Sequence, residues 1–378
     1  MKTYDVIVLG TGGVGAAALL HSARRGVRAL GLDRFPPGHD RGSSHGESRI
    51  IRRSYFEHPD YVPLLQSAYQ LWDELSALRG EELFHRTGQI YFGPANGTVI
   101  PGVLASAKKH ALDVQRLTIG EAQKEYPGFL APEGAEVVFE RDAGYLLVED
   151  CVRAQIEEAI KLGAQHRHGE VIQKWSADGS GVLVETDQGQ YSAERLIVSA
   201  GCWSNDLLSG LGVRLRILRK HLHWYATDSN DYLESNGCPC FFFETNGGYF
   251  YGFPNRGELG IKVAEHSGGR EISDPLSDPR KLDPTDVDRI EAFLARCLPG
   301  VSRRRTQHTV CFYTMSPDEH FIVDRHPEHG SVVFAAGLSG HGFKFTAALG
   351  KALAELSLDG AAGVDLDFLR LGRPQITS

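Results

Sequence analysis

The sequence has few cysteines and no long apolar run. Its 6 cysteines are scattered through 378 residues, and the one close pair, Cys238-Pro-Cys240, lacks the two-residue gap of zinc and redox motifs. A disulfide framework is therefore not expected. No apolar stretch approaches the roughly 18–20 residues that span a bilayer, so a membrane protein is not expected either.

An excess of positive charge is also missing. Lys and Arg number 40 against 48 Asp and Glu, a formal net charge of -8, which argues against a nucleic-acid-binding protein. Histidine pairs such as His221/His223 and His166/His168 have no completing ligand cluster, so no metal site is predicted. The N-terminal "MKTYDVIVLG" lacks the long apolar region of a signal peptide and the C-terminal "QITS" is no peroxisomal address, which makes the cytoplasm the expected location.

A glycine-rich turn lies between two strand patterns near the N-terminus. Residues 4–9, "YDVIVL", are typical of a buried parallel strand; Gly10-x-Gly12-x-x-Gly15 and a small-residue helix pattern follow, and a second strand ends at Asp33. In dinucleotide-binding units such glycines permit a tight turn and close approach of the backbone to pyrophosphate, and the acid accepts from a ribose hydroxyl. The sequence therefore predicts dinucleotide binding, with FAD and NAD both open.

A second glycine-rich loop, "GLSGHGFKF", opens a helix pattern near the C-terminus. Gly337, Gly340 and Gly342 again permit close approach of the backbone to a ligand. Glycine is common at such junctions, but His341 and Lys344 in the same loop would be costly to bury without a role. We expect the loop to contact the ligand.

Three arginines, Arg49, Arg52 and Arg53, follow a polar loop in "SHGESRIIRRSY". A guanidinium can bind a carboxylate or phosphate through two parallel hydrogen bonds. A solvated basic face is the alternative interpretation. The interleaved Ile50 and Ile51 indicate that part of the run is buried, which favours a binding role.

The order of strand and helix patterns predicts an α/β (α+β) fold with two domains. A Rossmann-like nucleotide-binding domain is expected from residues 1–85, 150–216 and 318–378. Residues 86–149, where short strands and turns are predicted, and residues 217–317 are expected to form a mostly antiparallel substrate domain.

These motifs, together with "FYGFP", "GIKVAEH" and "VCFYTMSPDEHFIVD", occur in an order that spans essentially the whole chain. The sequence resembles the monomeric sarcosine oxidase and N-methyl-tryptophan oxidase family of FAD-dependent amine oxidases. The resemblance implies a glutathione-reductase-type, D-amino-acid-oxidase-like FAD-binding domain. It also implies that FAD is bonded through its 8α carbon to the sulfur of Cys311, whereas a lone cysteine is more commonly an inert buried thiol.

The resemblance assigns further roles. Lys262 would lie at the re face of the flavin and activate oxygen, although a lysine on a strand can also simply extend to the surface. Arg49 would lie against the flavin, and Arg52 and Lys344 would hold the substrate carboxylate. The cavity would be lined by Tyr251, Tyr313, His266 and His341, of which Tyr313 and His266, with Lys262 and Arg49, are the candidate catalytic residues. The expected cofactor contacts are Gly10, Gly12, Gly13, Val14, Gly15, Asp33, Arg34, Ser44, Ser48, Arg49, Val171, Gly201, Trp203, Cys311, Gly337, Gly340, Gly342 and Lys344.

The sequence departs from the family pattern at three positions. Ser44 replaces a second histidine beside His45, Arg53 stands where a histidine is common, and Glu265 precedes His266 where an aromatic or basic residue is more usual. These changes leave the flavin chemistry in place and put the identity of the substrate in doubt.

The expected activity is oxidation of a secondary amine, most simply an N-methyl amino acid, to an imine that water hydrolyses, with O2 reduced to H2O2. No strong general base is evident, so the amine is expected to react in its neutral form. The alternatives are a dehydrogenase of the same fold with another electron acceptor, and a non-catalytic dinucleotide-binding protein. We expect a monomer without nucleic-acid or membrane partners.

Overall fold

The N-terminal strand lies inside a sheet of 8 strands. The computed structural model describes residues 2–179 and 181–376. The strands of this sheet are β1 (Lys2–Leu9), β2 (Ala29–Asp33), β9 (Gln165–His168), β10 (Ile172–Asp178), β11 (Gly181–Thr186), β12 (Gln190–Val198), β19 (Ile322–Arg325) and β20 (Val332–Ala336). Strands β9, β2, β1, β12 and β20 pair in parallel, and β10, β11 and β19 are added antiparallel.

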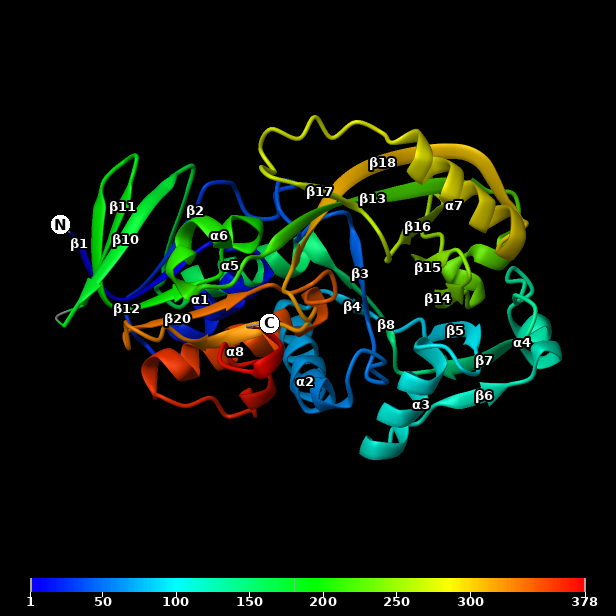
Figure 1. Cartoon of the computed structure of the whole chain (residues 1–378), viewed down its shortest axis with the longest axis horizontal. Helices are drawn as coiled ribbons and strands as arrows, with labels where there is room; N and C mark the ends of the chain where they lie inside the picture. Colours follow the sequence, from blue (N-terminus) through cyan, green and yellow to red (C-terminus); the bar gives the residue numbers. More distant parts are fainter. Residues whose placement is uncertain (1, 180, 377–378) are drawn as a thin grey trace.

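A second sheet of 9 strands lies beside the first, and the long strands β13 and β18 extend from it toward the first sheet (Figure 1). Its strands are β5 (Gln89–Pro94), β6 (Gln115–Leu117), β7 (Ala135–Glu140), β13 (Arg216–Thr227), β14 (Cys240–Thr245), β15 (Gly248–Phe253), β16 (Ile261–Glu265), β17 (Arg270–Ile272) and β18 (Val301–Met315). All pairs are antiparallel except β5 with β14. A small sheet of β3 (Ser48–Ile51), β4 (Phe84–His85) and β8 (Gly144–Leu147) lies between them.

Helices cover the first sheet, and α3 and α7 pack on opposite faces of the second. The α-helices are α1 (Gly13–Ala23), α2 (Val62–Arg79), α3 (Val99–His110), α4 (Ile119–Glu125), α5 (Val148–Lys161), α6 (Ser204–Leu207), α7 (Pro284–Cys297) and α8 (Thr346–Leu358). Among the described residues, no helix is both long and apolar enough to cross a bilayer.

Helix α1 packs unusually close to its neighbours because its residues are small. All of its residues are buried. A Cβ on Gly15 would lie 1.8 Å from the carbonyl oxygen of Gly10, and a Cβ on Gly350 in α8 would lie 2.3 Å from Cβ of Ala17. The glycine spacing predicted from the sequence is therefore required by the strand–turn–helix geometry itself.

The α/β fold class with a mostly antiparallel second sheet is confirmed. The strands of the first sheet fall within residues 1–85, 150–216 and 318–378, and those of the second within 86–149 and 216–317. On this basis we propose the domain division expected from the sequence. The prediction of only short strands and turns for residues 86–149 is wrong, because helices α3 and α4 lie there.

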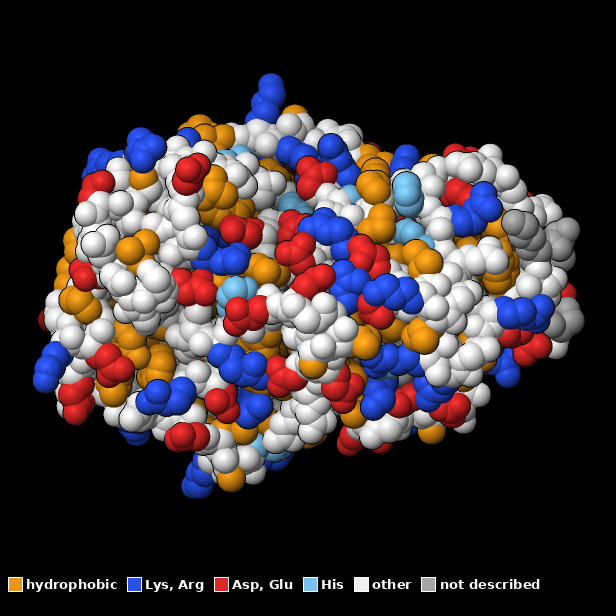
Figure 2. All heavy atoms as spheres, turned by 180° about the vertical axis from the view of Figure 1, so that it is seen from behind, with side chains coloured by type: hydrophobic (Ala, Val, Ile, Leu, Met, Phe, Trp, Pro, Cys, Tyr) orange, Lys and Arg blue, Asp and Glu red, His pale blue; other side chains and the backbone are white. Residues whose placement is uncertain are grey.

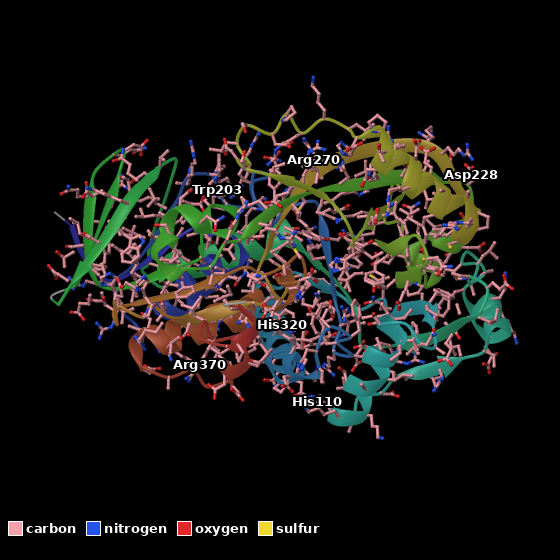
Figure 3. All side chains as sticks on the ribbon, viewed as in Figure 1. His110, Trp203, Asp228, Arg270, His320 and Arg370 are labelled. Carbon is pink, nitrogen blue, oxygen red and sulfur yellow. The ribbon has the colours of Figure 1, made fainter. Side chains whose placement is uncertain are left out.

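The two ends of the molecule are well separated in Figure 3, where Trp203 lies beside the first sheet and Asp228 lies at the far end of the second. On the face seen in Figure 2, positive and negative side chains are interspersed. The described part of that face therefore offers no continuous basic surface, in keeping with the net charge of -8.

Candidate active site

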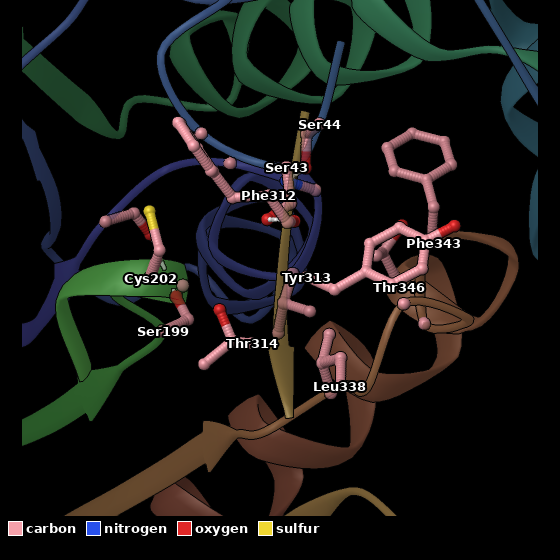
Figure 4. A pocket seen from close by; sticks show the side chains of 18 of the residues that line it. Ser43, Ser44, Ser199, Cys202, Phe312, Tyr313, Thr314, Leu338, Phe343 and Thr346 are labelled. Carbon is pink, nitrogen blue, oxygen red and sulfur yellow. Dashed lines mark hydrogen bonds between the residues drawn. The ribbon is translucent and has the colours of Figure 1, made fainter. Parts of the chain in front are cut away.

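A cavity of about 290 Å³ extends from the N-terminal glycine turn to the boundary between the two sheets. Its walls come from the loops after β1, β2, β12 and β20 and from strands of the second sheet. Figure 4 shows part of it, with Tyr313 and Thr314 of β18 between Cys202 on one side and Leu338 on the other. Ligands of parallel α/β sheets bind at this carboxyl edge of the strands.

The glycine-turn end of the cavity suits a dinucleotide. Gly12, the residue before α1, offers no side-chain cap, and its neighbour Gly13 donates its backbone N–H to Ser44 Oγ at 3.2 Å. The carboxylate of Asp33 accepts from the backbone N–H groups of Thr11 at 2.6 Å and Phe35 at 2.9 Å, which fixes it at the end of β2. A helix N-terminus with open N–H groups is a phosphate site.

Further along the cavity several buried donors have no partner within the described chain. They are Trp203 Nε1, Thr314 Oγ1 and Thr346 Oγ1. Buried polar groups are almost always hydrogen-bonded, so these three atoms point to a ligand with several acceptors. The glycine turn, Asp33 and these donors together fit FAD.

Cys311 lies in the wall of the cavity beside Arg49. Its side chain is buried, and Arg49 Nη2 donates to Cys311 Sγ at 3.1 Å. The same guanidinium donates to the carbonyl oxygens of Ser48 at 2.9 Å and Ser43 at 3.1 Å. Burial opposes the charge of Arg49, but the nearby Cys311 and other acidic groups outweigh it and raise the pKa of the guanidinium. The sulfur therefore faces a fixed positive charge.

Arg52 is bound to a carboxylate that the sequence analysis did not identify. Glu57 accepts from Arg52 Nη2 through both oxygens, at 2.7 and 2.8 Å, and the guanidinium lies 4.3 Å from the ring centres of both Tyr55 and Phe56. Burial favours the neutral acid, but the charge and hydrogen bonds of Arg52, together with the nearby His341 and Lys344, outweigh it and lower the pKa of Glu57 to about 2. The sequence feature that could have identified Glu57 is its position, five residues after Arg52 in the same loop.

Lys344 reaches the same cavity from the loop before α8. Its Nζ donates to the carbonyl oxygen of His341 at 2.8 Å, and burial, helped by the Arg52 charge, lowers the pKa of Lys344 to about 7. One cavity is thus lined by Arg52 and Lys344, which are 292 positions apart in the sequence. Their charges favour an anionic ligand between them.

Aromatic side chains form the rest of this end of the cavity. His266 Nδ1 lies 3.3 Å from Tyr313 Oη, and the Tyr251 ring lies 6.2 Å from the His266 ring. Burial lowers the pKa of His266 to about 3 and that of His341 to about 4, so both imidazoles are neutral at pH 7. Phe242, which the sequence analysis missed, completes the wall. An apolar methyl group or side chain would fit here.

Lys262 lies outside this wall. Its Nζ donates to the carbonyl oxygens of Gly46 at 2.5 Å and Ser48 at 2.7 Å and to Ser48 Oγ at 3.2 Å, and it lies 4.4 Å from the ring centre of Phe253. Burial and the Arg49 charge hold the pKa of Lys262 well below its ordinary value. The ammonium is therefore bound to the loop that carries Arg49 and does not itself line the cavity.

The structure brings most of the predicted site residues into this one cavity. The exceptions are Gly15, Ser48 and Lys262. The cavity is lined by Gly10, Gly12, Gly13, Val14, Asp33, Arg34, Ser44, Arg49, Arg52, Val171, Gly201, Trp203, Tyr251, His266, Cys311, Tyr313, Gly337, Gly340, His341, Gly342 and Lys344.

Comparison with known proteins gives consistent results. Residues 5–356 match the family model "FAD dependent oxidoreductase". Monomeric sarcosine oxidase of Bacillus sp. (strain B-0618) is 37% identical over 377 residues, covering 99% of this chain and 97% of the relative. N-methyl-L-tryptophan oxidase of Yersinia pestis (strain Pestoides F) is 37% identical over 372 residues, covering 98% and 99%.

Solved structures agree with this result. NikD, an unusual amino acid oxidase essential for nikkomycin biosynthesis, superposes with a TM-score of 0.86 at 25% identity and covers 98% of both chains. Glycine oxidase from Geobacillus kaustophilus superposes with a TM-score of 0.83 at 20% identity, covering 99% of each chain, which is a likeness of fold alone.

Proposed function

Because this chain belongs to the FAD dependent oxidoreductases, and is an FAD-dependent oxidase acting on CH–NH donors like its sarcosine and N-methyltryptophan oxidase relatives, we propose that its substrate is an N-methyl amino acid held by its carboxylate. The observation that carries this proposal is the presence of Arg52 and Lys344 in one buried cavity with aromatic walls. Glu57 supplies one carboxylate to Arg52, and a second anion would balance the two buried cations more fully. A substrate carboxylate supplies that anion.

The residues that would hold FAD are those at the glycine-turn end. The N–H groups at the start of α1 would bind the pyrophosphate, and Asp33 a ribose hydroxyl. When bound, FAD would accept a hydride equivalent (two electrons and one proton) from the carbon next to the amine nitrogen and pass it to O2, which takes up a second proton from water to give H2O2.

We further propose that Cys311 Sγ forms the covalent link to FAD. The sulfur lines the cavity, is 1% exposed and lies 3.1 Å from Arg49 Nη2. The guanidinium places a fixed positive charge beside this sulfur. Of the six cysteines, Cys202 also lines the cavity, but burial raises the pKa of its thiol and works against the thiolate, which is the nucleophilic form of cysteine.

Binding of an acid at Arg52 requires competition with Glu57. The substrate carboxylate would take over hydrogen bonds that Arg52 now makes at 2.7 and 2.8 Å to Glu57. Lys344 would add a second cation, because a bound anion favours its protonated form. The two contacts would leave the amine end of the substrate toward Tyr313 and His266.

The aromatic wall would receive the amine and exclude water. His266 is neutral at pH 7 because burial lowers its pKa to about 3, so it adds no positive charge next to the amine. Its Nδ1 shares a hydrogen bond of 3.3 Å with Tyr313 Oη, which positions both side chains. We propose that these two groups orient the neutral amine.

Lys262 is proposed to act on the oxygen half-reaction. Its ammonium is fixed by three oxygen atoms of residues 46 and 48, next to the loop that carries Arg49. Negative charge that develops when O2 is reduced favours the protonated form of Lys262, and its positive charge then stabilises the reduced oxygen.

Peroxide production from a panel of amines tests this function. N-methyl amino acids should give H2O2 and consume O2, whereas matched N-methyl amines without a carboxylate should react at least about 10-fold more poorly in kcat/KM, the loss expected when a charged hydrogen bond is missing. Equal kcat/KM for sarcosine and dimethylamine would contradict the proposal. Primary amino acids in the same panel show whether the N-methyl group is required.

A further inference from the structure

The outer face of the second sheet carries a cluster of three histidines and one aspartate. His221 and His223 are on β13, His308 is on β18, and Asp286 is in the first turn of α7. His223 and His308 are directly opposite each other in the β13–β18 pairing. Side chains on a strand alternate between faces, so His221 and His223 share one face and Leu222 the other.

This cluster lies apart from the active site. Leu222 belongs to the same apolar cluster as Cys311 and Tyr251, on the cavity side of the sheet. The histidines therefore lie on the opposite side, under α7, and none of the four residues lines the cavity. Figure 1 shows α7 alongside β13 and β18 at the end of the molecule away from the first sheet.

The four side chains already lie within reach of a common ion. His221 Nδ1 lies 2.7 Å from His308 Nε2, and His223 Nε2 lies 2.7 Å from Asp286 Oδ2. One ligand atom each from His221, His223 and Asp286 lie within 4.8 Å of one another. Neighbouring ligands on a tetrahedral zinc ion, with bonds of about 2.0–2.1 Å, are about 3.3 Å apart. Each close pair would open by less than 1 Å.

One ring in the cluster has a nitrogen without a partner. His223 is 0% exposed, and its Nδ1 makes no hydrogen bond within the described chain. Asp286 binds the other nitrogen of this ring and keeps 21% of its side chain exposed, while His308 is partly exposed. The cluster thus combines a buried ring, which Asp286 contacts at Nε2, with an open side through which an ion can enter.

We propose that this cluster is a binding site for a divalent transition metal, with Zn²⁺ as the expected ion. Its ligands are His221, His223 and Asp286, and His308 is the fourth. Three imidazoles and one carboxylate suit Zn²⁺, whereas Mg²⁺ and Ca²⁺ take oxygen ligands. The ion replaces the protons that the two close pairs now share, and it joins α7 to β13 and β18. The sequence analysis noted the His221/His223 pair but found no completing ligand, because Asp286 is 63 residues from His223.

One hydrogen-bond contact of His221 disfavours metal binding. Arg219 Nη1 lies 2.7 Å from His221 Nε2, and a metal at Nδ1 places a proton on that Nε2. The guanidinium of Arg219 is rigid and planar and also donates to Asp278 through Nε at 3.0 Å and to the carbonyl oxygen of Lys281 through Nη2, so Arg219 or His221 must shift as a whole to relieve this contact. The site is therefore expected to bind more weakly than a zinc site without such a neighbour.

Metal titration of the full-length, untagged protein tests the proposal. After removal of metal with EDTA, ZnCl2 followed by calorimetry should bind at one equivalent with a Kd below about 10 µM, and Zn²⁺ should raise the melting temperature. Co²⁺ in its place should give the visible absorption bands of a tetrahedral N/O site. A wild-type protein that binds neither ion saturably at one equivalent overturns the proposal without any variant.

Variants locate the site. Asp286→Asn keeps the shape of the side chain and His223→Gln removes the central ring; each should weaken Zn²⁺ binding at least 100-fold. His329→Gln is the matched control, because His329 belongs to another histidine pair, with His326 at 4.8 Å between ring centres, and it should bind as wild type does. Unchanged binding in folded Asp286→Asn, or equal loss in the control, shows ions held elsewhere and overturns the assignment.

Discussion

The carboxylate of Glu57 binds the guanidinium of Arg52 through both oxygens, at 2.7 and 2.8 Å, in the cavity that Lys344 also lines. The side chains of Arg52 and Glu57 are 4% and 14% exposed. A buried pair of this kind stabilises little in net terms, but either partner left alone is costly. Glu57 therefore compensates Arg52 while no acid is bound, and it competes with every acid that enters.

Glu57→Gln should strengthen the binding of acids. The amide keeps the shape of the side chain but removes the competing charge, so a carboxylate at Arg52 gains a stronger contact. Charge-assisted hydrogen bonds contribute about 1.5–3 kcal/mol, so the Kd of an amine-free acid such as acetate should fall roughly 10-fold or more. The Kd is measured by titrating the protein with acetate and following the change in the flavin absorption spectrum. A higher Kd in Glu57→Gln would mean that Glu57 organises the binding site and does not compete with the acid for Arg52.

Arg52→Ala and Lys344→Ala should each weaken the binding of sarcosine-like acids by roughly 10–200-fold, since each removes a charge-assisted contact. The flavin should remain bound in both. Arg53→Ala is the matched control: Arg53 follows Arg52 directly, but its guanidinium pairs with Asp142 at 3.1 Å and stacks on Tyr69. If Arg53→Ala lost acid affinity as strongly as Arg52→Ala, the effect would come from the loop as a whole.

Cys311→Ala should release the flavin from covalent attachment. Acid-precipitated wild-type protein should remain yellow, and the peptide that contains Cys311 should carry the mass of FAD. In Cys311→Ala the flavin should appear in the supernatant, while Cys202→Ala, which changes another cysteine in the cavity wall, should retain it. Wild-type flavin found wholly in the supernatant would contradict the covalent link.

The fold was predictable where local pattern and packing agree. The strand, glycine turn and helix at residues 2–23 follow from β-branched and small residues, and the structure requires those glycines. Helix α3 was missed because its first turn contains Pro101 and Gly102, which disfavour helix in isolation. In the structure a Cβ on Gly102 would lie 2.5 Å from the carbonyl oxygen of Phe56, so tertiary packing selects glycine there.

The candidate site was predictable as a set of residues but not as a set of contacts. Motif resemblance identified Arg52 and Lys344, yet Glu57 was missed, because an ion pair depends on how the loop folds back. The position of Lys262 behind the cavity wall depends on the pairing of β16 with β13, which opposes Lys262 to Trp224. Long-range strand pairing of this kind has no local signal in one sequence.

Lys262→Met should slow reoxidation of the reduced flavin by O2 much more than its reduction by substrate under anaerobic conditions. Removing a preorganised charge costs about 3–4 kcal/mol, or roughly 10²–10³ in rate. Lys220→Met is the matched control, because Lys220 is also buried and also donates to three oxygen atoms, in its case the backbone carbonyl oxygens of His266, Ser267 and Gly268. Equal losses in both half-reactions of Lys262→Met would indicate a structural lysine.

Acid binding should depend on pH through Lys344. Burial lowers the pKa of Lys344 to about 7, so above that pH the free enzyme carries a neutral amine there. A bound carboxylate favours the ammonium form, so binding takes up a proton. The Kd of acetate should therefore be flat below pH 7 and rise by up to about tenfold per pH unit above it.

The other groups in the cavity do not produce this slope. Burial lowers the pKa values of His266 to about 3 and His341 to about 4, and the Arg52 charge lowers that of Glu57 to about 2 despite its burial. All three keep one charge state between pH 6 and 9. Lys344→Met should remove the slope, and Lys351→Met, which changes a partly exposed lysine of α8, the helix that follows Lys344, should retain it. A slope that survives in Lys344→Met would assign the titration to another group and contradict the role of Lys344.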